Sequence, residues 1–138
     1  MKKRIILLLI TVMLLNVFVV AASAADSTLS QITPRWTNCA SVDTSFVIMD
    51  GTSEASIKYA GAESMSYATF KVEVQKRFLL VFWNTVDEQT ITVYDVRGTE
   101  YIYSTLNASG TYRAKFTLTF YGTDGSSDVI EDTKEYSY

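Results

Sequence analysis

The sequence predicts an all-β protein, a two-sheet antiparallel β-sandwich of seven to eight strands. Three observations predict this fold class. Apolar and polar residues alternate with a period of two in several stretches, most cleanly over residues 112–121. Turn signals such as Asp50-Gly51 separate these stretches at short intervals. After the first 24 residues, no stretch repeats the three- and four-residue apolar spacing of a helix over several turns.

The first 24 residues have the features of a secretory signal peptide. Lys2-Lys3-Arg4 is a positively charged start, residues 5–20 are an apolar run, and Ala22-Ser23-Ala24 is a small-residue cleavage signature. We therefore expect residues 1–24 to be a signal peptide and the protein to be secreted. The alternative is an uncleaved membrane anchor, and only in that case do we expect the membrane as a partner.

The remainder, residues 25–138, has the length of a single domain. We expect a flexible N-terminal arm over residues 25–35 and the sandwich over residues 36–138. Residues 25–138 hold nine basic and fifteen acidic residues, a formal charge of −6. This dispersed negative charge disfavours nucleic acid and anionic membranes, which bind clustered basic residues. The expected ligand is an unknown protein or glycan, and the oligomeric state is open.

The sandwich is predicted to begin with a hairpin. A first strand from Trp36 ends at Asp50-Gly51, a dipeptide that favours a type I′ turn because both central residues need positive φ. A second strand then runs back beside the first. The inward residues of the first strand are predicted to be Trp36, Ala40, Val42, Phe46 and Ile48, and those of the second Ala55, Ile57 and Tyr59.

Two segments of different character follow. Met65–Lys76 alternates cleanly and predicts a third strand. Phe78–Trp83 has six consecutive apolar residues, which is typical of a strand covered on both faces or of a strand with one face left for a partner. Lys76-Arg77 precedes this run, where charges discourage aggregation. The inward residues of the third strand are predicted to be Ala68, Phe70, Val72 and Val74.

The next segments alternate less clearly. Asn84–Glu88 predicts a polar loop, and Arg97-Gly98 predicts a turn after a short strand that begins at Ile91. Residues 100–106 predict a further strand, whose inward residues are Ile102 and Leu106 and whose outward residues are Tyr101 and Tyr103.

The cleanest alternation belongs to the strand from Tyr112 to Tyr121, which we expect to be central in the sandwich. A loop over residues 122–128 then leads to a last strand, Val129–Tyr138. Its many charged residues are typical of an exposed sheet edge.

Leu106, Gly110 and Tyr112 resemble the tyrosine corner of fibronectin type III and immunoglobulin-like domains. The resemblance implies that the Tyr112 hydroxyl bonds to the backbone just upstream. We expect Trp36 and Trp83 to be structural as well.

These landmarks, with Pro34-Arg35-Trp36-Thr37 and Val74-Gln75-Lys76, also resemble a group of short secreted proteins of unknown function from Gram-positive bacteria. Those proteins are predicted to be immunoglobulin-like or fibronectin type III-like β-sandwiches. The resemblance implies a sandwich and supplies no catalytic residue.

The composition excludes several kinds of chemistry. The chain has no histidine, so neither a Ser-His-Asp nor a Cys-His arrangement is possible, nor is a histidine-based metal site. Cys39 is the only cysteine, which leaves a buried thiol or an intermolecular disulfide. We assign no catalytic, cofactor-binding or metal-binding residue and expect no cofactor.

Acidic pairs are the remaining candidates for chemistry. Asp87-Glu88 and Glu131-Asp132 would serve a hydrolase if two carboxylates faced each other across a groove, but a solvated surface is the favoured interpretation. The stretch from Asp124 to Asp128 offers oxygen ligands for calcium, although it lacks EF-hand spacing, and a plain turn is favoured.

Aromatic residues carry the functional signal. Four tyrosines fall on faces assigned to solvent: Tyr67, Tyr101, Tyr103 and Tyr121. We expect a non-catalytic recognition or adhesion module at or near the cell surface, which contacts a protein through this tyrosine-rich face or through Phe78–Trp83. A carbohydrate-binding module that uses the same tyrosines is the alternative. A carboxylate-dependent hydrolase is a third, disfavoured hypothesis.

Overall fold

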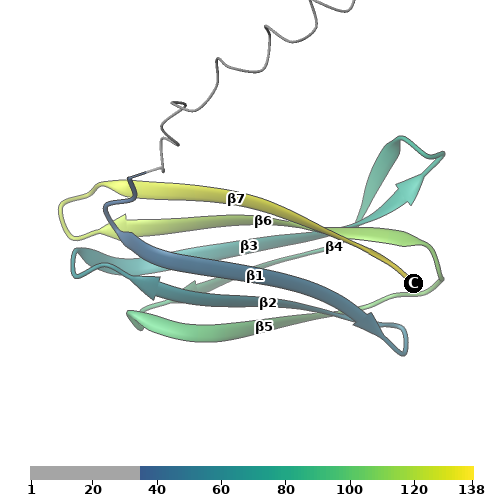
Figure 1. Cartoon of the computed structure of the whole chain (residues 1–138), viewed down its shortest axis with the longest axis horizontal. Helices are drawn as coiled ribbons and strands as arrows, with labels where there is room; N and C mark the ends of the chain where they lie inside the picture. Colours follow the sequence, from purple (N-terminus) through teal and green to yellow (C-terminus); the bar gives the residue numbers. More distant parts are fainter. Residues whose placement is uncertain (1–34) are drawn as a thin grey trace, which may run out of the picture. The chain divides into compact units, whose positions relative to one another are not determined.

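Seven strands pair into two antiparallel sheets in the computed structural model, which describes residues 35–138 (Figure 1). The predicted all-β, two-sheet antiparallel sandwich is thereby confirmed. Residues 35–138 form a compact unit with its own core. The predicted signal peptide and all but the last residue of the predicted N-terminal arm lie outside the described residues.

One sheet has three strands in the order β1-β2-β5, and the other has four in the order β4-β3-β6-β7. No helix in the described part of the chain is long and apolar enough to cross a membrane. The strands are β1 (Cys39–Met49), β2 (Thr52–Gly61), β3 (Met65–Phe78), β4 (Phe82–Val93), β5 (Arg97–Thr105), β6 (Thr111–Gly122) and β7 (Ser127–Ser137).

The predicted hairpin between β1 and β2 is confirmed. Met49 pairs with Thr52, and the two residues between them, Asp50 and Gly51, have φ values of 49° and 75°. Both angles are positive, as a type I′ turn requires.

The start of β1 differs from the prediction. The strand begins at Cys39 rather than at Trp36, and Ala40 is exposed although the alternation placed it inward. The pairing with β2 shifts between Cys39 and Ser41, which marks a β-bulge. An extra residue in one strand reverses which face each side chain occupies, so Cys39 points inward in place of Ala40. Trp36 lies before the strand and packs partly buried against the core.

The core lies between the sheets and depends most on β3 and β6. These strands pair along nearly their full lengths in the interior of the four-stranded sheet, so the predicted central place of β6 is confirmed. Both strands alternate as predicted, and the Phe70 ring meets the Tyr59 ring of the other sheet edge to face, with centroids 4.9 Å apart. The buried apolar residues of these two strands are Met65, Ala68, Phe70, Val72, Val74, Tyr112, Ala114, Phe116, Leu118 and Phe120.

The course of β4 and β5 corrects two predictions. Asn84–Glu88 is part of β4 and not a polar loop. Arg97 and Gly98 begin β5, where they pair with Ala60 and Tyr59 of β2, so they form no turn. A Cβ atom on Gly98 would lie 3.0 Å from the Tyr59 hydroxyl. This glycine marks a close approach within the sheet.

Hydrogen bonds link the two sheets at both sides of the sandwich. On one side, the Asp87 carboxylate of β4 accepts from the Ser104 hydroxyl of β5 at 2.6 Å. On the other, the Asp128 carboxylate accepts from the backbone N–H of Asn38 at 2.5 Å, and Thr44 of β1 donates to Asp132 of β7. The lateral edges of the sandwich are therefore polar.

Candidate functional site

Within residues 35–138, the most exposed run of apolar residues is the end of the β3–β4 hairpin. Residues Phe78–Phe82, here named the apolar tip, are between 52% and 84% exposed. Figure 1 shows this hairpin, in teal, projecting past the ends of the neighbouring strands. The predicted strand over Phe78–Trp83 is therefore wrong. Residues 79–81 form a turn between the end of β3 and the start of β4, and no second sheet covers either face of this segment.

The turn of the apolar tip has an unusual backbone for its sequence. Phe78 pairs with Phe82, and between them Leu79 and Leu80 have φ values of 48° and 66°. Positive φ costs a side chain with a Cβ roughly 1–2 kcal/mol and favours Gly or Asn. Because both positions are leucine, the sequence contains no residue typical of a turn here, which explains the wrong prediction.

A cationic and aromatic cluster lies directly behind the apolar tip. Arg77 pairs with Trp83 across the hairpin, and its guanidinium lies 4.9 Å from the centre of the indole. The guanidinium of Arg113, on β6, lies 4.2 Å from the same ring. Trp83 therefore packs against two arginines on the outer face of the four-stranded sheet, outside the core.

The four candidate tyrosines do not form one surface. Tyr67 and Tyr121 stack on the four-stranded sheet, with ring centres 4.5 Å apart, and Tyr94 tilts against Tyr67 at 6.2 Å. Tyr101 and Tyr103, 54% and 56% exposed, are on β5 of the other sheet. Period-two alternation identifies the outward residues but leaves open which sheet each strand joins.

The tyrosine corner is present as the sequence predicted. The Tyr112 side chain is 2% exposed, and its hydroxyl donates to the Ala108 carbonyl oxygen at 2.5 Å. Leu106 is buried beside it. Gly110 has a φ of 152°, and its N–H donates to the Tyr138 carbonyl at 2.8 Å. These residues hold the β5–β6 connection against the end of the sandwich.

An open concavity of about 520 Å³ lies on the three-stranded sheet. Its charged residues come from three strands: Asp43 of β1, Lys58 of β2 and Arg97 of β5. Tyr101 belongs to the same outward row of β5 as Arg97. No motif in the sequence indicates this concavity, because its residues are far apart along the chain.

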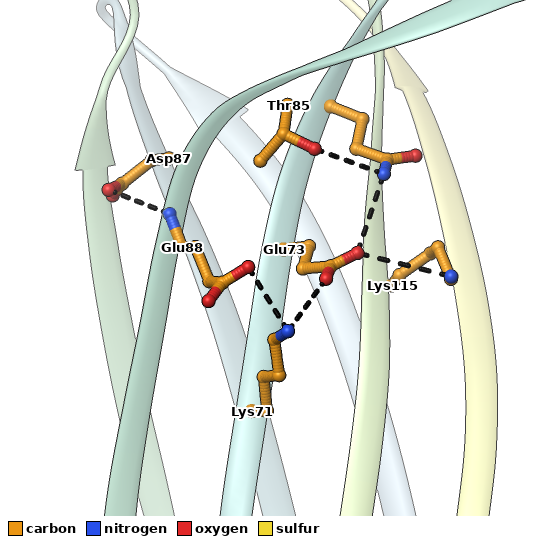
Figure 2. Close-up of polar contacts among 7 residues, drawn as sticks. Lys71, Glu73, Thr85, Asp87, Glu88 and Lys115 are labelled. Atoms are coloured by element: carbon orange, nitrogen blue, oxygen red, sulfur yellow. Dashed lines mark hydrogen bonds and ion pairs between the residues drawn. The ribbon is translucent and has the colours of Figure 1, made fainter.

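The structure brings together a carboxylate pair that the sequence analysis missed. Glu73 of β3 and Glu88 of β4 are cross-strand partners, and Lys71 bridges them at 2.9 and 3.1 Å (Figure 2). The hydrogen bond from Lys71 lowers the pKa of Glu73. A general acid needs a raised pKa, so this arrangement suits a surface ion pair. Alternating charges on the two strands could have indicated it.

In each predicted acidic pair, the two side chains point to opposite faces of their strand. Asp87 points inward at the edge of the sandwich, where the Ser104 hydroxyl donates to it. Glu88 points instead to Lys71 on the outer face, and Figure 2 shows the side chains of Asp87 and Glu88 pointing apart. Asp132 likewise accepts from Thr44, while its neighbour Glu131 is exposed. Consecutive residues of a strand face opposite ways, so neither pair converges on a substrate.

The proposed calcium ligands and the thiol are also engaged locally. Asp124 accepts from the backbone N–H and hydroxyl of Ser126, and Asp128 accepts from the backbone of Asn38 and Cys39. Within residues 35–138, no three acidic or cysteine side chains gather as metal ligands would. Cys39 is 3% exposed, and burial together with Asp128 raises the pKa of its thiol to about 11.

Comparisons with protein-family models, with curated proteins and with solved structures find no match to this chain.

Proposed function

We propose that this chain is a secreted, non-catalytic recognition or adhesion module that acts at or near the cell surface. The observation that carries the proposal is the apolar tip, where five successive large apolar side chains face solvent. Contiguous exposed apolar surface of this kind is typical of an interaction site. Secretion is proposed from the charged start, apolar run and cleavage signature of residues 1–24, and membership of the Gram-positive group named above remains part of the proposal.

The backbone of the apolar tip supports a binding role. Asn or Gly would relieve the positive φ of Leu79 and Leu80, and either residue would also reduce the exposed apolar surface. The leucines therefore lower the stability of the hairpin in solution. A partner that buries them compensates for this cost, because removal of apolar side chains from water is favourable.

The test is binding of residues 25–138 to intact cells. The protein is labelled with a fluorophore and added to a panel of bacterial and animal cells, alongside the double variant Leu79→Asn, Leu80→Gly. Both substitutions suit positive φ, so the variant should be at least as stable in urea as the parent. Val129→Thr is the matched control, because it removes an exposed apolar side chain at the opposite end of the four-stranded sheet.

We expect the parent and Val129→Thr to bind at least one cell type and the double variant to bind at least about tenfold more weakly, given the apolar area removed. Equal binding by the double variant, or no binding by the parent to any cell, would contradict the proposal.

Carbohydrate binding is the second candidate, and the concavity on the three-stranded sheet favours it. Asp43, Lys58 and Arg97 supply hydrogen-bonding groups there, and Tyr101 offers an exposed ring on the same face. Sugar rings stack on such aromatic faces while polar groups orient them. A glycan array tests this candidate: binding lost on Tyr101→Ala and Tyr103→Ala, but kept in the tip variant, would assign a glycan ligand to this sheet.

A further inference from the structure

The apolar tip is apolar on every side, and we infer that the surface it enters is a phospholipid bilayer. This inference rests on the proposed function, since it names the partner of the same segment. It departs from the sequence-based expectation that a membrane is a partner only if residues 1–24 remain as an anchor, because the exposed apolar tip offers a second route to the bilayer. Phe78 and Phe82 face each other across the hairpin, and the turn Leu79–Val81 beyond them has no polar side chain. A protein groove usually contacts one face of such a segment and leaves the other polar. A bilayer surrounds the segment completely.

The residues behind the apolar tip match the depth profile of a membrane interface. Trp83 and Arg77 form the first pair behind Phe78 and Phe82. Leu80 lies three residues from Trp83, so the tip extends at most about 10 Å beyond the indole. Interfacial segments bury their apolar side chains to a depth of roughly 5–10 Å. Trp83 would then lie among the headgroups, where indole rings are enriched.

The hairpin also satisfies most of its own backbone hydrogen bonding, as a segment that enters a bilayer must. Polar backbone groups without partners are costly in hydrocarbon. Pairing between β3 and β4 continues up to Phe78 and Phe82, and within the turn the Val81 N–H donates to the Leu79 carbonyl at 2.8 Å. The tip therefore supplies backbone partners up to Leu79 and Val81, on either side of Leu80.

The contacts of the two arginines near the tip favour insertion driven by apolar contact over attraction to anionic lipid. Arg77 is paired with Glu135 at 3.2 Å, and Arg113 donates to Gln75 at 2.7 Å and packs on Trp83. Residues 25–138 carry a formal charge of −6, which opposes long-range attraction to an anionic surface. A zwitterionic bilayer is therefore sufficient, and binding to it should be insensitive to salt.

The experiment is sedimentation of residues 25–138 with phosphatidylcholine vesicles at low and high salt. The apolar run of residues 5–20 is omitted because it would bind vesicles itself, and residues 35–138 form a compact unit with its own core. The parent, the double variant Leu79→Asn, Leu80→Gly and the control Val129→Thr are compared. In a Trp36→Phe background, Trp83 is the only tryptophan and reports its surroundings by fluorescence.

We expect the parent and Val129→Thr to sediment with the vesicles equally at both salt concentrations, with a blue shift of Trp83 emission. We expect the double variant to lose binding by at least about tenfold, in keeping with the apolar area lost. No vesicle binding by the parent overturns the inference.

Two results would reassign the tip. If the tip is needed for cell binding, vesicles are not bound, and protease treatment of the cells abolishes binding, the partner is a protein and the proposed function stands. If the parent is a dimer in sedimentation equilibrium, the double variant is a monomer and vesicles are not bound, a second copy covers the tip and the bilayer inference fails. If the parent binds neither cells nor vesicles, both the bilayer inference and the proposed function are contradicted.

Discussion

At the scale of single residues, the Tyr112 hydroxyl makes a local polar contact at the end of the sandwich. It is buried and donates to the carbonyl of Ala108, four residues upstream. Because both groups lie in one short stretch, the spacing of Leu106, Gly110 and Tyr112 was enough to predict the contact. Local motifs of this kind can be recognised in a sequence before the fold is known.

Tyr112→Phe removes this hydrogen bond and leaves the Ala108 carbonyl without its partner. The free energy of unfolding should fall by about 1–2 kcal/mol. Urea unfolding followed by fluorescence measures the change, and Tyr101→Phe, at an exposed position, should leave the unfolding midpoint unaltered. A Tyr112→Phe protein as stable as the parent would show that the corner contributes nothing to stability.

Cys39 is expected to be unreactive in the folded protein. Its thiol is buried and its pKa is raised to about 11, so very little thiolate exists near neutral pH. A maleimide should label it slowly at pH 8 in buffer and fully in concentrated urea, as mass spectrometry would reveal. Rapid labelling of the native protein would restore the intermolecular disulfide as an explanation for this residue.

At the scale of elements, β4 shows what the sequence concealed. It is an edge strand whose inward positions include Asp87 and Gln89. Asp87 accepts from Ser104, and Gln89 donates to the Tyr103 carbonyl at 2.8 Å. Polar groups thus occupy places where alternation would show apolar residues, so the segment resembles a loop when only hydrophobicity is considered.

The link from Asp87 to β5 makes stability depend on pH. The hydrogen bond from Ser104 lowers the pKa of Asp87 below its ordinary value of 3.8. A lowered folded-state pKa stabilises the protein above about pH 4, and this stabilisation is lost as the pH falls through the folded-state pKa. Asp87→Asn should therefore destabilise the protein at pH 7 and narrow the stability difference between pH 7 and pH 3.

Urea unfolding at the two pH values measures both effects. Ser104→Ala should reproduce the same pattern more weakly, because Gln89 still donates to Asp87 at 2.9 Å. An equal loss of stability on acidification in the parent and in Asp87→Asn would show that this carboxylate does not link the sheets.

At the scale of the whole molecule, the sequence predicted the two-sheet class and most inward residues of β2, β3 and β6. Period-two alternation carries that information directly. It did not predict the bulge at Ala40, since one inserted residue reverses the pattern locally. It also did not predict the division of the tyrosines between the sheets, because partner strands are chosen by contacts distant in sequence.

The apolar tip was missed for a related reason. Six consecutive apolar residues resemble a buried strand, and no Gly, Asn or Pro marks the turn at Leu79 and Leu80. The signal that was available is symmetry, since Phe78 and Phe82 are equally spaced about Leu80. The hairpin can be recognised only when the residues before and after the turn are known to pair. Its exposure to solvent on both faces then follows.

The most direct test of the account is to place a reporter at the apolar tip. Leu80→Cys in residues 25–138 is labelled with an environment-sensitive fluorophore, while buried Cys39 remains unlabelled. The account predicts emission typical of water for the free monomer and a blue shift when intact cells are added. Blue-shifted fluorophore emission from the free monomer, or emission that does not change when cells are in excess, would contradict the account.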